Sequence, residues 1–306
     1  MIGLGLGIGV TMARRPRLTP VISITSGSGY AGSTYTSTVA GQWTADGVPI
    51  TGATGSSYVM SAANEGKAIR CGASNAIQMW TPKQRPDWVW VNPADFGSMV
   101  LSASKVVSID AGNVVLEQST DSLRFTLTQA GGFPILSAGS LKSTPDAIPL
   151  GAAPQFMLLS APTGYGYYSP AWSALTASDN RGAGLVSESS NPGAFFYNRF
   201  VNASGTTDGS KRMFAAVTSA SVGATLIKDG VVAIQSTTRN VMPTLSHLSL
   251  SGVWGDVYQA IAVPGGDGAL SMEDRQAVEG YWGHKFGISG NLPVSHPYKT
   301  TAPRVS

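Results

Sequence analysis

The chain has 306 residues, of which 42% are hydrophobic and only 12% are charged, with a formal net charge of +3. The charged share is about half of the roughly 25% that is typical of globular domains. The few basic residues form no stripe with interleaved aromatic residues, which excludes the usual pattern of a nucleic-acid-binding protein.

Glycine (37 residues) and proline (18 residues) are frequent in this chain. Such a composition suits short strands joined by many turns, and it predicts an all-β fold. The chain has one cysteine, Cys71, so no internal disulfide can form and nothing requires an oxidising compartment. We expect Cys71 to behave as a small buried hydrophobic residue.

Residues 1–20 are predicted to form an N-terminal arm, in which glycine alternates with aliphatic residues from Gly3 to Gly9. The positive charges follow the apolar stretch, unlike those of a signal peptide, and no phosphate-loop pattern is present. No stretch reaches the roughly 18 apolar residues of a membrane span. An extended arm would place its aliphatic side chains on one edge and could add a strand to the sheet of a partner protein. The alternative is a disordered leader without a function. The predicted docking residues are Ile2, Leu4, Leu6, Ile8, Val10, Arg14, Arg15 and Arg17.

Residues 21–78 contain short alternating runs separated by the turn signals SGSG, ADG, TGATG and NEG. The segments GQWTADGVPITGAT and EGKAIRC, with a tyrosine between them, resemble the small immunoglobulin-like domains that are common in bacteriophage virion proteins. The resemblance implies a two-sheet sandwich with an inward-facing core of Trp43, Tyr58, Ile69 and Cys71. Because no second cysteine is present, packing alone must hold the two sheets together.

Residues 79–90 are predicted to be a linker, rich in proline and tryptophan. We expect Trp80, Trp88 and Trp90 to seal a junction between domains, since tryptophan buries a large area at such places.

Residues 91–290 continue the pattern of strands and turns, and the dipeptide Asp229-Gly230 predicts a tight hairpin. One helix is predicted near the end, where Ser271 can cap the N-terminus and Gly287 can stop the helix. Apolar residues recur there at helical spacing, which predicts that Val278, Tyr281, Trp282 and Phe286 lie against a sheet. We expect Glu279 and Lys285 to be partly solvated.

The segment LSMEDRQAVEGYWGHKFGISGNLPVSHPY resembles the end of phage and bacterial concanavalin A-like (laminin G-like) modules. The resemblance implies a jelly-roll sandwich over residues 91–290 and a tail over residues 291–306. The matching residues are Arg275, Glu279, Gly280, Tyr281, Lys285, Gly287, Leu292, Pro293, His296, Pro297 and Tyr298.

The sequence shows no pattern that predicts catalysis, a cofactor or a metal site. Glycosidases on this fold carry alternating carboxylates on one strand, and no such run occurs. The three histidines, His247, His284 and His296, fit no metalloprotease or hydrolase motif. The loop residues that could supply oxygen ligands to calcium are better explained as ordinary turn residues; they are Asp179, Asn180, Asp208 and Asp267.

Two aromatic stretches are candidates for stacking on sugar rings, although half of their side chains could instead alternate into the core. The candidate carbohydrate-binding residues are Tyr165, Tyr167, Tyr168, Trp172, Phe196 and Tyr197.

The two resemblances together imply a non-enzymatic structural or decoration protein on the surface of a phage virion, on the head or the tail. Its expected partners are other virion proteins (capsid, portal or tail) and further copies of itself. The alternative is a carbohydrate-binding fibre or adhesin that recognises a host surface glycan.

Overall fold

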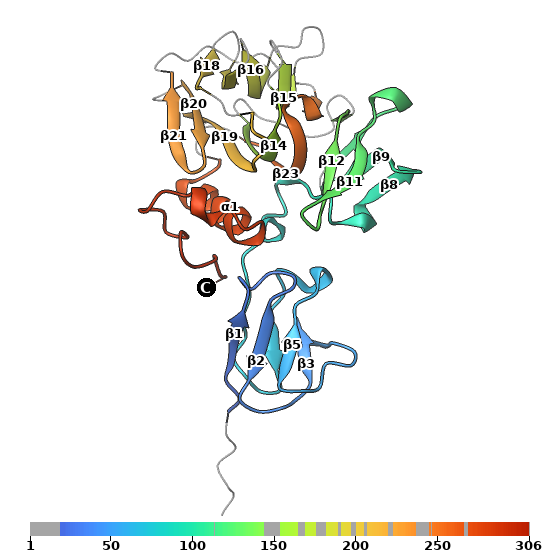
Figure 1. The fold of residues 1–306 in the computed structure, drawn as a ribbon, viewed down its shortest axis with the longest axis vertical. Coiled ribbons are helices and arrows are strands. Elements are labelled where there is room, and N and C mark those ends of the chain that lie inside the picture. Colours follow the sequence, from blue (N-terminus) through green and yellow to red (C-terminus); the bar gives the residue numbers. More distant parts are fainter. Residues whose placement is uncertain are drawn as a thin grey trace, which may run out of the picture.

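We describe a computed structural model of the chain, in which one small and one large β unit lie on either side of a single α-helix (Figure 1). The structure describes residues 19–112, 114–143, 154–164, 169–175, 182–188, 191–196, 200–204, 207–219, 223–236, 245, 247–265 and 269–305. The predicted docking arm therefore lies outside the described residues. No helix in the described part of the chain has the length and apolar character needed to cross a membrane.

The small unit consists of two three-stranded antiparallel sheets, in the orders β1-β2-β5 and β4-β3-β6. The strands are β1 (Ile22–Ser26), β2 (Thr34–Ser37), β3 (Trp43–Ala45), β4 (Val48–Pro49), β5 (Ser57–Val59) and β6 (Ile69–Cys71). Trp43 is fully buried between the sheets, and its indole nitrogen donates to the carbonyl oxygen of Gly55 at 2.9 Å. Tyr58, Ile69 and Cys71 share this core, which confirms the predicted set.

The first sheet of the large unit has the strand order β7-β23-β14-β19-β20-β21, and all its pairs are antiparallel. The strands are β7 (Val89–Val91), β14 (Gln155–Pro162), β19 (Arg212–Ser219), β20 (Gly223–Lys228), β21 (Val231–Gln235) and β23 (Gly255–Val263). The large sheet thus already begins at Val89, inside the predicted linker. Asp229 and Gly230 have φ angles of 50° and 80° and close the predicted hairpin between β20 and β21.

The second sheet follows the order β10-β13-β22-β15-β16-β17-β18. Three further strands, β9, β11 and β12, connect β10 back to β23, and β8 pairs with β9. The strands are β8 (Met99–Ser102), β9 (Lys105–Asp110), β10 (Val115–Glu117), β11 (Thr126–Ala130), β12 (Phe133–Ser137), β13 (Ser140–Ser143), β15 (Ser169–Leu175), β16 (Gly182–Glu188), β17 (Asn191–Phe196), β18 (Phe200–Asn202) and β22 (His247–Ser251). The fold is all-β, as the composition predicts.

The central strand β14 is buried on both of its faces, which explains the continuous apolar run from Phe156 to Leu159. Phe156 and Leu158 point into the core between the two sheets. Met157 and Leu159 point to the opposite face and pack in a second core that includes the helix.

Helix α1 (Met272–Lys285) begins at Ser271, whose hydroxyl accepts from the backbone N–H of Asp274 as predicted. Val278, Tyr281 and Trp282 are fully buried against the first sheet, which confirms this packing. The opposite side of the helix is covered by the small unit and by the C-terminal tail.

Because both sides of α1 are covered, the expectation that Glu279 is partly solvated is wrong, whereas Lys285 keeps an exposed part, as expected. Glu279 is 1% exposed and is bonded to Arg275 at 2.5 Å and to His296 at 3.1 Å. A Cβ atom on Gly280 would lie 2.5 Å from that of Tyr298, so only glycine lets the tail approach the helix this closely.

Candidate binding cleft between the two β units

Of the six predicted sugar-binding aromatic residues, Trp172 is the one whose side chain the structure describes, and it lies in the core. Trp172 is fully buried, packs edge-on against Phe156 and donates its indole N–H to the carbonyl oxygen of Ile261 at 2.7 Å. It belongs to the core because strand alternation points it inward, so it cannot stack on a ligand. Tyr165, Tyr167, Tyr168 and Tyr197 lie outside the described residues, as does the side chain of Phe196.

Among the other sequence candidates, Asp208 and His284 lie within the described residues and bond to protein groups. The carboxylate of Asp208 accepts from Ser210 and its pKa is lowered chiefly by this hydrogen bond, while Asp179, Asn180 and Asp267 lie outside the described residues. His284 bonds to the carbonyl oxygen of Tyr298 at 2.9 Å and has a structural role. In the part of the chain that the structure describes, no group of three or more metal-ligating side chains comes together.

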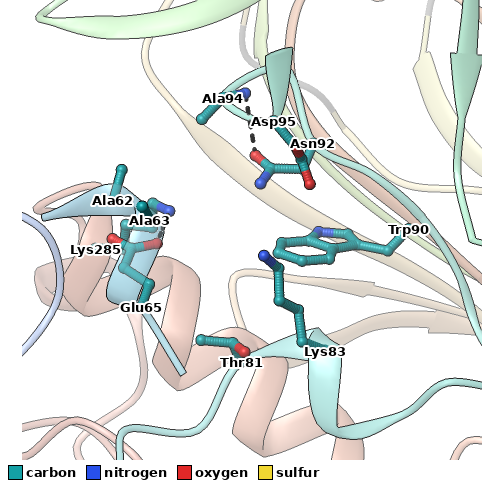
Figure 2. Close-up of a pocket in the computed structure, with 10 residues that line it drawn as sticks. All are labelled: Ala62, Ala63, Glu65, Thr81, Lys83, Trp90, Asn92, Ala94, Asp95 and Lys285. Carbon is teal, nitrogen blue, oxygen red and sulfur yellow. Dashed lines mark hydrogen bonds and ion pairs between the residues drawn. The ribbon is translucent and has the colours of Figure 1, made fainter. Parts of the chain in front are cut away.

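A cleft opens instead at the junction of the two units, along the connector between them. It consists of two adjoining hollows of about 210 and 310 Å³ that share Lys83, Trp90, Asn92 and Asp95. Figure 2 shows the Trp90 ring with Asn92 on one side and Lys83 on the other. Ala62, Ala63, Glu65 and Lys285 lie across the first hollow, so both units contribute to its walls.

The connector is held by a capped turn that places Lys83 at the edge of the cleft. Pro82 begins a short 3₁₀ turn, Pro82–Gln84, and the side chain of Gln84 accepts from the backbone N–H of Thr81 at 2.6 Å. Gln84 also donates to the carbonyl oxygen of Gly66 at 3.0 Å, which ties the connector to the small unit.

Strand β7 then positions Trp90 by simple alternation. Val89 and Val91 are fully buried in the core between the sheets, so the side chain between them points to the opposite face, toward α1. Trp90 is partly exposed in the cleft, and its ring lies edge-on to Tyr281 with the ring centroids 6.4 Å apart. The indole therefore offers an aromatic surface whose orientation is fixed from behind.

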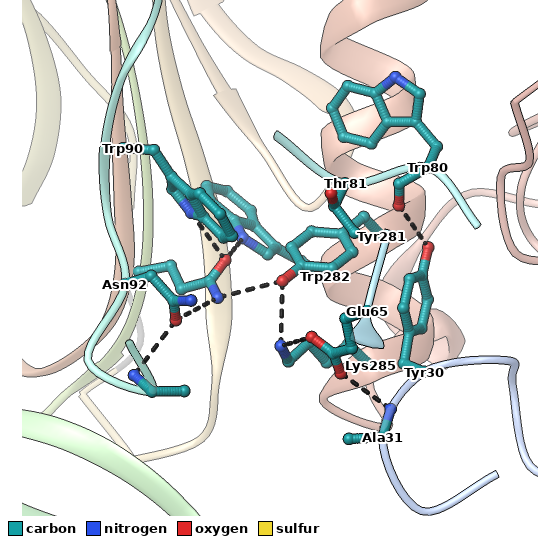
Figure 3. A network of polar contacts seen from close by, with 12 residues as sticks. Tyr30, Ala31, Glu65, Trp80, Thr81, Trp90, Asn92, Tyr281, Trp282 and Lys285 are labelled. Atoms are coloured by element: carbon teal, nitrogen blue, oxygen red, sulfur yellow. Dashed lines mark hydrogen bonds and ion pairs between the residues drawn. The ribbon is translucent and has the colours of Figure 1, made fainter. Parts of the chain in front are cut away.

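A buried polar network supports this surface (Figure 3). Gln259 of β23 accepts from the indole nitrogens of Trp90 at 3.3 Å and Trp282 at 2.7 Å. The amide nitrogen of Gln259 donates to the side-chain oxygen of Asn92 at 3.0 Å and to the Tyr281 hydroxyl at 3.2 Å.

Asn92 presents its amide N–H groups to the cleft. Its side-chain oxygen accepts from Gln259 and also from the backbone N–H of Ala94 at 3.3 Å, so this end of the amide is occupied. The residue is 9% exposed, and its nitrogen faces the hollow above the Trp90 ring. A ligand atom placed there must therefore be a hydrogen-bond acceptor.

The far wall of the cleft is held by an ion pair between the two units. Lys285 donates to Glu65 at 2.5 Å and to the Tyr281 hydroxyl at 3.1 Å, and Glu65 also accepts from the backbone N–H of Ala31 at 2.8 Å. Burial lowers the pKa of Lys285, but Tyr281 and Glu65 outweigh burial and raise it overall. Burial raises the pKa of Tyr281, so its hydroxyl stays neutral.

The arrangement can bind a small polar ligand that also has an apolar face. Sequence analysis predicted Trp90 only as part of a domain seal and did not single out Asn92, Asp95 or Gln259. The alternation of side chains in β7 indicates on which face of the sheet Trp90 lies. Which residues cover that face cannot be predicted locally, because they come from α1, far away in the chain.

No family model matches the sequence, and no curated protein sequence matches it either. Among solved structures, the chain is similar to a Trypanosoma rangeli sialidase in complex with 2,3-difluorosialic acid (13% identity, 53% of this chain and 31% of that chain, TM-score 0.35). It is also similar to domain 4 of AbnA, a GH43 extracellular arabinanase from Geobacillus stearothermophilus, in complex with arabinotriose (11% identity, 52% of this chain and 82% of that domain, TM-score 0.38). A third similar structure is the binding domain of Paraclostridial Mosquitocidal Protein 1 (11% identity, 54% of this chain and 46% of that chain, TM-score 0.36). This chain thus spans about a third of the sialidase and most of the arabinanase domain.

Proposed function

We propose that this protein is a non-enzymatic carbohydrate-binding protein whose sugar ligand binds in the cleft between the two β units. The observation that carries the proposal is the partly exposed Trp90 ring beside the amide donors of Asn92 and the carboxylate of Asp95. The C–H face of a sugar packs on an aromatic ring, and its hydroxyls need fixed donors and acceptors around that ring.

The dimensions and charges of the cleft support a small, neutral or weakly charged ligand. The larger hollow, about 310 Å³, is at the lower end of the roughly 300–1,000 Å³ that is typical of ligand pockets. Lys83 and Asp95 bring one charge of each sign to the shared part of the cleft.

Glu65, the acidic residue on the far wall, is not free to take part in hydrolysis. Hydrolysis of a glycosidic bond requires two carboxyl groups that flank it. Both oxygens of Glu65 are bonded to protein groups, one to Lys285 and one to Ala31. Glu65 therefore holds the two units together and is not available as an acid or nucleophile.

The full chain on a glycan array, followed by titration calorimetry with the sugars retained, tests the proposal. Trp90→Ala and Asn92→Ala should each abolish measurable binding, while the matched loop variant Tyr167→Ala should bind as the wild type does. Absence of any glycan binding by the wild type would overturn the proposal. Loss of binding in Tyr167→Ala alone would place the site in the 164–172 loop instead.

We further propose that the protein is displayed on a virion surface by its N-terminal arm. Glycine alternates here with Ile2, Leu4, Leu6, Ile8 and Val10. In an extended arm the glycine face would let the backbone of a neighbouring protein approach closely, while the aliphatic side chains on the other face would be buried, which supports this role. A protein lacking residues 1–12 should keep its unfolding midpoint but fail to enter particles when co-expressed with the other virion proteins. Normal incorporation of the truncated protein would remove the support for the arm's role.

A further inference from the structure

We infer that Gln259 is a positioning residue of the cleft, and that it makes the site favour sugars with a strong acceptor oxygen, such as an acetamido carbonyl or a carboxylate. The inference rests on the proposed carbohydrate-binding function. It extends that function by tracing to one buried side chain, which does not itself line the cleft, the fact that Asn92 presents donors and not an acceptor to the ligand.

The hydrogen bonds of Gln259 allow only one orientation of its amide. Its oxygen accepts from the indole nitrogens of Trp90 and Trp282, which are donors only. Its nitrogen must therefore face Asn92 and Tyr281. Both lone pairs and both N–H groups of this fully buried side chain are used.

The fixed amide of Gln259 in turn fixes the amide of Asn92. If Asn92 were reversed, its NH₂ group would face the NH₂ group of Gln259 and the backbone N–H of Ala94, and three donors would meet without an acceptor. The nitrogen of Asn92 is thus directed toward the hollow, where Lys83 supplies a second donor on the other side of Trp90. A ligand oxygen beside Asn92 must accept a hydrogen bond, and an acceptor-only oxygen meets this requirement without a hydrogen that needs a partner of its own.

The place of Gln259 in the sheet supports a role beyond packing. It lies in β23 among the buried residues Tyr258, Ala260 and Ile261, where an apolar side chain of similar volume would avoid the desolvation of an amide. The amide contacts the two cleft residues, Trp90 and Asn92, as well as the helix residues Tyr281 and Trp282.

The test compares Gln259→Glu and Gln259→Met with the wild type, using N-acetylglucosamine, glucuronic acid and glucose as probes. The wild type should bind the first two sugars about tenfold more tightly than glucose, as expected for one well-placed hydrogen bond. The ionised carboxylate that Gln259→Glu introduces still accepts from both indoles but cannot donate, so Asn92 should reverse and binding should fall about tenfold.

Protonation should rescue Gln259→Glu in part, because a neutral carboxyl group has one O–H that can donate to the side-chain oxygen of Asn92 and so restore the orientation of that amide. Burial raises the pKa of a carboxyl group, so binding should recover as the pH falls from about 8 to about 5. Gln259→Met should bind weakly at every pH, and the wild type should vary little. The titratable group in direct contact with position 259 is the neutral phenol of Tyr281 on α1. Tyr281 in turn contacts Lys285, which is paired with Glu65. Lys83 and Asp95 are the charged groups in the shared part of the cleft.

The ¹⁵N indole signals of Trp90 and Trp282, recorded by NMR, report whether the acceptor at position 259 is retained. Unchanged signals with lost binding in Gln259→Glu at high pH would support the inference, and wild-type binding at high pH would overturn it. Asn92→Asp, at the edge of the cleft, provides the test if the Gln259 variants do not fold. It presents only acceptors to the ligand and should bind all three sugars at least about tenfold more weakly than the wild type does.

The two proposals fail in different ways. If the wild type binds no sugar, the carbohydrate-binding function itself is wrong. If Trp90→Ala loses binding while Asn92→Asp or a folded Gln259→Glu binds normally, or if glucose binds as tightly as the other probes, only the role of Gln259 is wrong.

Discussion

The core of the small unit and the junction between the two units both use a tryptophan whose indole N–H is bonded, but in opposite surroundings. Trp43 is fully buried among Tyr35, Ile69 and Cys71 and donates to a backbone carbonyl. Trp90 is partly exposed and donates to the side chain of Gln259, in a network of polar and charged groups. The apolar core provides stability, whereas the polar junction fixes the orientation of the side chains that line the cleft.

The greatest expected effect comes from removing the element that covers the junction side of the sheet. Deletion of residues 271–290 would expose the apolar face that Met157, Leu159 and Ile261 share with α1. We expect the truncated protein to aggregate, because an exposed apolar patch of this kind drives association. Size-exclusion chromatography would show it, and a soluble protein with a cooperative unfolding transition would contradict the prediction.

Trp43→Ala tests the apolar side of the comparison. Removal of this fully buried side chain should lower the free energy of unfolding by roughly 3–5 kcal/mol, since a large cavity remains. Urea denaturation measures this loss. Val48→Ala, at a position that is 67% exposed, is the control and should change stability little. A negligible effect of Trp43→Ala would show that the small unit does not depend on this core.

Variants of the ion pair between Lys285 and Glu65 test how much the polar junction contributes to stability. The two side chains are 7% and 9% exposed, so Lys285→Met should cost about 3 kcal/mol because it leaves an unpaired buried carboxylate. The double variant Glu65→Met/Lys285→Met should recover most of this loss, since two apolar side chains can pack where the charges were.

A surface pair provides the matched control for this measurement. Asp121 is 72% exposed in its pair with Arg124, so Asp121→Ala should cost at most about 1 kcal/mol. Equal losses for Lys285→Met and Asp121→Ala would show that the junction pair behaves as a solvated one.

Alkaline pH should weaken the junction by a smaller, graded amount. Burial raises the pKa of Tyr281, so the unfolded chain loses this proton at a lower pH than the folded protein does. Stability is therefore complete below about pH 10, the ordinary pKa of tyrosine, and falls as the pH rises above it. The raised pKa of Lys285 acts in the same direction. Tyr281→Phe should make the fall shallower in thermal unfolding between about pH 9 and 11, and an unchanged slope would contradict this origin.

Most of the secondary structure could be predicted from neighbouring residues, while the site could not. The hairpin turn at Asp229-Gly230 and the cap at Ser271 follow from local patterns and agree with the structure. The inward face of Trp43, which the resemblance to immunoglobulin-like domains implies, agrees as well. The pairing of Lys285 with Glu65 does not follow from local patterns, because the two residues are 220 positions apart in the chain. For Trp172 the sequence left two alternatives open, a sugar-binding surface and the core. The structure selects the core, where strands from elsewhere in the chain cover the ring.

The sequence by itself determined the elements, because backbone conformation depends on contacts between residues close together in the chain. Alternation and turn residues specify strands and hairpins in this way. The tertiary structure alone decided which faces are covered and where the cleft opens. Asn92 and Gln259 are 167 residues apart and meet only when β7 pairs with β23, so the polarity of the cleft is a property of the folded chain.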